Sequence, residues 1–144
     1  MGLSLDPGGC VFLDTAPFIY FFEENPAYVE RLARFFDAVL ESDIEIVTSM
    51  VTYLEVLVLP ERQGAVHLAA RYRAFLTNSS QVSIHPLTFA VADEAARLRA
   101  THGLRTPDAI QLATARACGA DMVLTNDAKW RGIPDFRIVL VDEL

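Results

Sequence analysis

The spacing of apolar residues divides the chain into short continuous runs and longer amphipathic segments. The short runs are typical of buried strands. They cover residues 10–13, 44–47, 82–84, 121–124 and 137–141. Between them, apolar residues recur every three or four positions, as on one face of a helix. The helices predicted in this way cover residues 27–41, 48–59, 64–76, 88–100 and 106–119.

Two of these helices have boundaries that the sequence explains. Ser49, or its neighbour Thr48, can cap the second helix, and Pro60 is expected to stop it because proline removes a backbone donor. Thr106 is expected to cap the last helix, with Pro107 at its first helical position.

Strands alternate with helices along the chain. This order predicts the α/β class, as a three-layer sandwich with a mostly parallel central sheet. The length fits one domain covering residues 1–144, and no internal repeat or linker divides it. Because ligands of such folds bind beyond the carboxyl ends of the strands, site residues are expected just after strands and at the starts of the following helices.

Two aspartates follow predicted strands. Asp14 comes directly after the run at 10–13, and Asp127 closes the segment that follows the run at 121–124. Each also has an ordinary structural explanation, because aspartate often caps a turn at the end of a strand.

Two further acids lie in helices that follow strands. Glu55 lies about two turns into the helix at 48–59, which is apolar nearly all round and is therefore expected to be buried. A buried carboxylate costs several kcal/mol unless it is paired, bound to metal or neutral. Glu55 is therefore expected to serve a metal or to pair with a distant arginine. Asp108 lies in the first turn of its helix, where the helix dipole alone would favour an acid.

These four acids are all expected at one edge of the sheet. Carboxylates forced together repel one another unless a cation lies between them. Ligands that are all oxygen suit Mg²⁺ or Mn²⁺, and neither the three histidines nor the two cysteines have the spacing of a zinc site. We therefore expect the catalytic and metal-binding residues to be Asp14, Glu55, Asp108 and Asp127.

The net charge of −7 counts against a nucleic-acid binder that works through a basic surface. It is compatible with an enzyme whose carboxylates bind metal, because the metal then supplies the positive charge that meets a phosphate.

Localisation is inferred from cysteines and hydropathy. Cys10 and Cys118 lie in apolar segments and are expected to be free, buried thiols in a reducing cytosol. No apolar run is long enough for a transmembrane helix, and the first six residues lack the basic and apolar regions of a signal peptide. A cytoplasmic protein without a membrane partner is expected.

Four segments, in this order, carry a resemblance to a known family. They are Leu13–Thr15, Ser49–Val56, Leu104–Ala115 and Gly119–Asp127. The third, LRTPDAIQLATA, is the most specific. Over nearly its whole length the chain resembles PIN-domain proteins, and more closely the VapC-type toxins of prokaryotic toxin–antitoxin pairs.

The resemblance implies a Mg²⁺- or Mn²⁺-dependent endoribonuclease that cleaves RNA with the four acids as its metal site. It also implies inhibition by a small cognate antitoxin and a homodimeric assembly. Three residues beside the acids are candidates for contacts that support the metal site or bind phosphate: Thr15, Thr125 and Asn126. The family often has Phe where this chain has Trp130, so an aromatic residue is retained.

Other functions fit the sequence less well. A phosphoryl-signalling receiver domain needs a lysine after its last strand, where this chain has Asp142 and Glu143. A haloacid-dehalogenase-type phosphatase needs a second aspartate two residues after the first, where this chain has Ala16. A non-catalytic PIN-fold module that binds RNA or protein stays open, and metal-dependent RNA cleavage would distinguish it from the nuclease.

Overall fold

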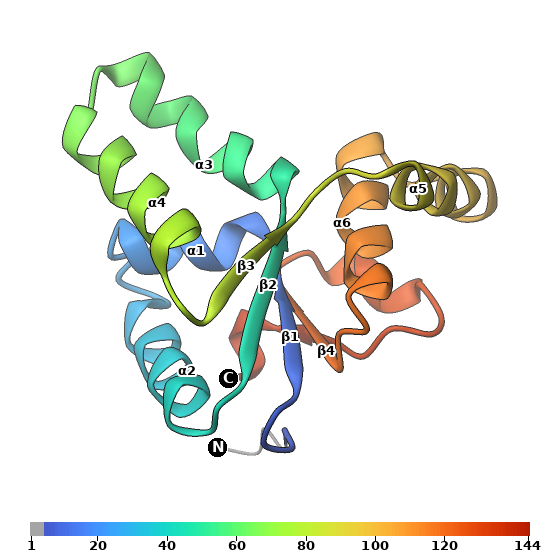
Figure 1. The fold of residues 1–144 in the computed structure, drawn as a ribbon, viewed down its shortest axis with the longest axis horizontal. Coiled ribbons are helices and arrows are strands. Elements are labelled where there is room, and N and C mark those ends of the chain that lie inside the picture. Colours follow the sequence, from blue (N-terminus) through green and yellow to red (C-terminus); the bar gives the residue numbers. More distant parts are fainter. Residues whose placement is uncertain (1–4) are drawn as a thin grey trace.

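In the computed structural model, of which residues 5–144 are described, the strands form one parallel sheet (Figure 1). Its strands are β1 (Cys10–Leu13), β2 (Glu45–Ser49), β3 (Val82–His85), β4 (Met122–Thr125) and β5 (Ile138–Leu140). Their order is β3-β2-β1-β4-β5, and all four neighbouring pairs are parallel. The predicted parallel α/β sheet is confirmed, and β1 lies at its centre.

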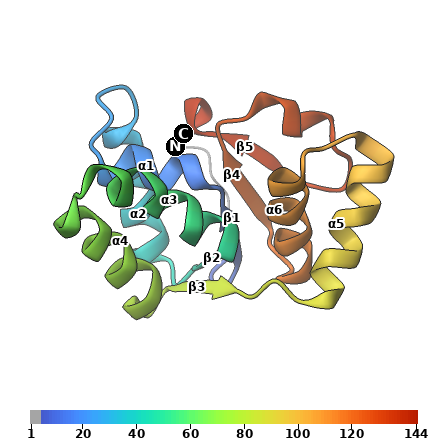
Figure 2. The ribbon, with the colours of Figure 1, turned by 90° about the horizontal axis from the view of Figure 1, so that it is seen from above.

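Helices cover both faces of this sheet, which gives the predicted three layers (Figure 2). One face carries α1 (Thr15–Phe22), α2 (Val29–Glu41), α3 (Met50–Gln63) and α4 (Val66–Asn78). The other face carries α5 (Phe89–His102) and α6 (Thr106–Ala117). Two short 3₁₀ helices, η1 (Ala128–Gly132) and η2 (Val141–Glu143), flank β5.

The side chains of strand β1 point alternately to the two faces of the sheet and so contribute to two hydrophobic cores. Val11 and Leu13 face the core beneath α1–α4, whereas Phe12 faces the core beneath α5 and α6. All three side chains are fully buried. The carboxyl end of β1 is therefore held from both sides of the sheet, and Asp14 comes directly after it.

Helix α1 was not predicted from the sequence. Its residues, TAPFIYFF, are apolar on nearly every side, so no amphipathic pattern marks a helix. Asp14 begins it by accepting a hydrogen bond from the backbone N–H of Thr15.

Two predicted helix boundaries are wrong. Pro60 lies inside α3, which continues to Gln63 and ends at Gly64 with φ of 66°. The buried proline lies in the last turn, where its missing N–H removes one bond of the ladder, and glycine supplies the left-handed end. Thr106 is already helical, and Arg105 precedes it as a cap that makes no side-chain hydrogen bond.

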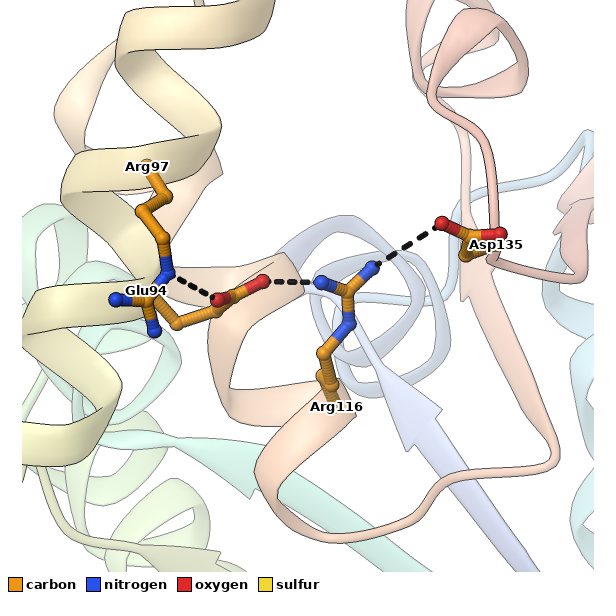
Figure 3. A network of polar contacts seen from close by, with 4 residues as sticks. All are labelled: Glu94, Arg97, Arg116 and Asp135. Carbon is orange, nitrogen blue, oxygen red and sulfur yellow. Dashed lines mark hydrogen bonds and ion pairs between the residues drawn. The ribbon is translucent and has the colours of Figure 1, made fainter.

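An ion-pair network fixes α5 against α6 (Figure 3). Glu94 of α5 accepts from Arg97 Nε at 2.9 Å and from Arg116 Nη1 of α6. Arg116 Nη2 also lies 4.0 Å from Asp135, in the segment before β5. The network holds α6, which carries Asp108, against its neighbours.

Both cysteines are free, as predicted, but each is only half-buried. Burial raises the pKa of Cys10 to about 12 and also raises the pKa of Cys118. The signal-peptide expectation depends in part on residues 1–4, which lie outside the described residues. In residues 5–144, no helix has the length and apolar character needed to cross a membrane.

Candidate active site

Asp14 lies where β1 ends and α1 begins, at the carboxyl edge of the sheet. Its Oδ1 accepts from Thr15 N at 2.8 Å and from Gln111 Nε2 at 3.0 Å. Its Oδ2 accepts from Thr125 Oγ1 at 2.7 Å. These donors come from α1, α6 and β4, and all three are neutral.

The pKa of Asp14 is raised above its ordinary value, chiefly because burial disfavours the charged carboxylate. The nearby charge of Glu55 raises it further. The hydrogen bonds from Thr125, Thr15 and Gln111 act in the opposite direction, because they stabilise the ionised form. Asp14 is thus a partly buried acid whose negative charge is only partly compensated by the protein.

Glu55 lies beside Asp14 but is exposed, so its predicted burial is wrong. Its Oε1 accepts from Thr15 Oγ1 at 2.8 Å. The error arose because α3 is apolar nearly all round, yet Leu54 is 62% exposed and Val58 is 43% exposed. An apolar helix face that the rest of the chain leaves uncovered looks in the sequence like a buried one.

Gln111 is a site residue that the sequence analysis missed. It is 1% exposed, and its Nε2 donates to Thr52 Oγ1 at 2.7 Å as well as to Asp14. Its Oε1 accepts from Ser49 Oγ, the hydroxyl that caps α3. One signal was present: an amide occurs in an otherwise alanine-rich helix, three positions after Asp108 and therefore on the same face.

The other two predicted acids have local partners. Asp108, in the first turn of α6, lies 3.5 Å from Arg105 Nε. Asp127 caps η1, with Oδ1 accepting from Lys129 N at 3.0 Å. Its backbone N–H donates to Thr125 Oγ1 at 3.1 Å, and Thr125 itself donates to Asp14.

The structure therefore brings Asp14 and Glu55 together, whereas the side chains of Asp108 and Asp127 bond to partners close to them in sequence. Within residues 5–144, no three His, Cys, Asp or Glu side chains converge closely enough to hold one metal ion. Thr15 and Thr125 contact the acids directly.

Asn126 contacts tyrosines instead of an acid. Its Nδ2 lies 3.3 Å from Tyr20 Oη and 3.4 Å from Tyr28 Oη, and the two rings stack at 4.6 Å. Its buried Oδ1 has no hydrogen-bond partner among the described residues.

The chemistry of Asp14 and Glu55 fits a hard divalent cation. A carboxylate oxygen offers two lone pairs, and Asp14 Oδ2 uses one of them for Thr125. Glu55 Oε2 has no hydrogen-bond partner among the described residues. No lysine or arginine bonds to either acid within the part of the chain that the structure describes, so a cation could supply the missing positive charge.

Fold and site together define an α/β protein with an acidic site at the carboxyl edge of a parallel sheet. The PIN domain model matches residues 11–135, and the chain therefore belongs to the PIN-domain family. The predicted resemblance to this family is confirmed. No curated protein sequence matches the chain significantly.

Solved structures with the same fold include toxin–antitoxin proteins. The chain is similar to VapBC2 from Rickettsia felis bound to a promoter DNA fragment, at 18% identity and a TM-score of 0.74, covering 91% of this chain and 98% of that one. It is also similar to a toxin–antitoxin complex from Klebsiella pneumoniae, at 26% identity and a TM-score of 0.69, covering 93% of this chain and 99% of that one. A third similar structure is VapC20 from Mycobacterium tuberculosis, described as a sarcin-ricin loop cleaving toxin. Its identity is 20% and its TM-score 0.68, covering 88% of this chain and 98% of that one.

Proposed function

We propose that this chain is a metal-dependent endoribonuclease and the toxin of a type II toxin–antitoxin pair. The observation that supports this most directly is the pairing of partly buried Asp14 with Glu55 at the carboxyl edge of the sheet, where neutral donors alone bond to Asp14 among the described residues. The PIN family and the cleaving toxin among the similar structures favour RNA as the substrate.

In this proposal Mg²⁺ or Mn²⁺ is held by Asp14, Glu55, Asp108 and Asp127. The ion would supply positive charge to the phosphate and activate water for hydrolysis. Asp108 is free to join because its ion pair with the 82% exposed Arg105 is a surface contact worth only about 0–1 kcal/mol. Asp127 keeps Oδ2 free of the bond that caps η1.

The protein's own residues divide the remaining work. Asp14 is fixed by its three donors and serves as the anchor of the site. Glu55 is exposed and has an oxygen without a partner among the described residues, so it can accept the proton of the attacking water. The water oxygen bonds to phosphorus while the bond from phosphorus to the leaving ribose oxygen breaks.

Three further expectations accompany the nuclease. A small cognate antitoxin is proposed as a partner, since similar structures are described as VapBC or toxin–antitoxin complexes. A homodimer is proposed, and the exposed apolar side chains of α3 favour a protein interface there. We propose the cytoplasm as the place of action, because RNA substrates are found there.

The test is RNA cleavage by the purified chain, freed of any antitoxin. Cleavage should require Mg²⁺ or Mn²⁺, stop when a chelator is added, and be lost in Asp14→Asn. Cleavage that survives exhaustive chelation would rule out the metal mechanism.

A non-catalytic PIN-fold module that binds RNA or protein is the second candidate. It is favoured by the arrangement of the acids, because no three His, Cys, Asp or Glu side chains converge on one metal position in residues 5–144. The same assay separates the nuclease from the non-catalytic module. A chain that binds RNA but does not cleave it with either Mg²⁺ or Mn²⁺ supports the module.

A further inference from the structure

The two acids of the site are joined by a chain of hydrogen bonds that runs through Gln111 and two threonines. Thr15 Oγ1 lies 2.8 Å from Glu55 Oε1 and 3.2 Å from Thr52 Oγ1. Gln111 Nε2 lies 2.7 Å from Thr52 Oγ1 and 3.0 Å from Asp14 Oδ1. Gln111 and Thr52 are 1% and 0% exposed, so water does not compete for the bond between them.

The direction of each bond follows from counting protons. A hydroxyl has one proton, and Thr15 donates its proton to the carboxylate of Glu55. Thr52 must then be the donor to Thr15, and its own oxygen accepts from Gln111. The amide of Gln111 has two protons, and the second goes to Asp14. A further contact from Nε2 to Thr15 Oγ1, at 3.4 Å, is the longest of the set.

The opposite end of the Gln111 amide is fixed in the same way. Ser49 Oγ accepts from the backbone N–H groups of Val51 and Thr52, where it caps α3, so its single proton is available to Gln111 Oε1. A rotated amide would point its oxygen at Asp14 and lose both donations. The buried cap of α3 thus sets which end of Gln111 faces the acids.

We infer that Gln111 is a positioning residue that orients both Asp14 and Glu55 toward the ion, directly for Asp14 and through Thr52 and Thr15 for Glu55. Gln111 belongs to α6, Thr52 to α3, and Asp14 with Thr15 to the junction of β1 and α1. One buried amide therefore ties three elements together at the point where both acids must keep an acceptor oxygen open. The inference rests on the proposed metal site.

The side chain at this position must be long and must offer both a donor and an acceptor. Methionine has a similar length, but it would deprive Asp14 and Thr52 of a donor and Ser49 of an acceptor. Glutamate would place a third carboxylate against Asp14. Support of this kind around metal ligands is worth about 10- to 100-fold in metal affinity or activity.

The experiment measures Mn²⁺ binding by calorimetry, together with melting temperature, for the wild type, Gln111→Met and Thr52→Val. Thr114→Val is the matched control. It removes a buried hydroxyl from the same helix, whose only described bond is to the carbonyl of Ile110. Binding is measured without RNA, so the result does not depend on activity.

Gln111→Met should weaken Mn²⁺ binding by about 10-fold or more while Thr114→Val binds as the wild type does. Thr52→Val should weaken binding less, because it disconnects Glu55 and leaves Asp14 its donor. In RNA cleavage, raising Mn²⁺ should restore the kcat of Gln111→Met with KM for RNA unchanged, which a merely structural role would not produce.

Equal Mn²⁺ affinity in wild type and folded Gln111→Met would overturn the inference. If Gln111→Met does not fold, Thr52→Val decides, and wild-type affinity in that variant overturns it. A wild type that binds Mn²⁺ but cuts no RNA refutes the nuclease and leaves this test intact. A wild type that binds no Mn²⁺ refutes both.

Discussion

Asp14 is a partly buried carboxyl group held by neutral donors, and this makes its ionisation depend on folding. Because burial raises its pKa above the ordinary 3.8, the folded state holds the proton more tightly than the unfolded chain. The ionised carboxylate therefore lowers stability, and the loss develops as pH rises from the unfolded pKa through the raised folded pKa.

The variant Asp14→Asn should remove this dependence, because an amide carries no charge at any of these pH values. Urea unfolding with a chelator present, between about pH 4 and pH 7, should show wild type losing stability as pH rises and Asp14→Asn losing less. Asp37→Asn, at an exposed acid of α2, is the control. A stability deficit in Asp14→Asn that is the same at every pH would contradict the prediction.

Glu55 should tolerate the loss of its charge without unfolding the protein. It is exposed, no basic side chain bonds to it within the described residues, and a glutamine oxygen can still accept from Thr15. Glu55→Gln should change stability by less than about 1 kcal/mol and abolish cleavage. Melting temperature and RNA cleavage measure the two effects.

Glu61→Gln is the matched control for this variant. It lies on the same helix and loses only a surface ion pair with Arg73, worth about 0–1 kcal/mol. It should keep full activity. An unstable Glu55→Gln that still cuts RNA would remove Glu55 from the catalytic residues.

At the scale of single residues, the sequence locates the acid at the end of β1 but not the amide that supports it. Asp14 follows an apolar run and could be predicted by position. Gln111 reaches Asp14 across 97 positions of sequence, and nothing local marks such a contact. The predicted burial of Glu55 was wrong, because burial depends on which other elements cover α3. The sequence of one helix does not contain that information.

At the scale of elements, α6 brings Gln111 to Asp14 and carries Asp108 in its first turn. Asp108 lies there with the helix dipole and one long ion pair to Arg105. Asp108→Asn should therefore cost only about 0.3–1 kcal/mol of stability in metal-free protein, while cleavage is lost. Chemical unfolding with a chelator measures the first effect. A loss well above this range would indicate a structural role for Asp108.

Helix α1 and the end of α3 show why some elements escape prediction. Periodicity identifies helices that are half-buried, such as α2, but α1 packs apolar side chains on nearly all sides. Proline disfavours the continuation of a helix but does not always end it. In α3 the ring of Pro60 is buried, and the turn continues to Gly64.

At the scale of the whole molecule, alternating strands and helices predict the parallel sheet and the edge at which a site is expected, but not the order of the strands. The order β3-β2-β1-β4-β5 places β1 between β2 and β4. That arrangement brings Thr125 of β4 and Ser49 of β2 to the two sides of Asp14. The contacts that define the site are therefore products of topology.

The surface of α3 offers an apolar interface. A groove of about 530 Å³ is lined by Met50, Tyr53, Leu54, Leu57, Val58, Glu61 and Arg73. Several of its apolar side chains are exposed, which soluble monomers rarely leave in one patch. Because Glu55 lies on the same helix, a partner bound there would cover the surface beside the proposed site.

The proposed homodimer should therefore depend on Val58, which lines this groove. Light scattering during gel filtration should give twice the chain mass for the wild type. Val58→Glu should shift it toward the monomer, because the new charge would be buried without a partner in the interface. Leu40→Glu is the matched control, since Leu40 is 54% exposed on α2 and should leave the dimer intact. A wild type that remains monomeric at high concentration would contradict the homodimer, and a dimer that survives Val58→Glu would place the interface away from this groove.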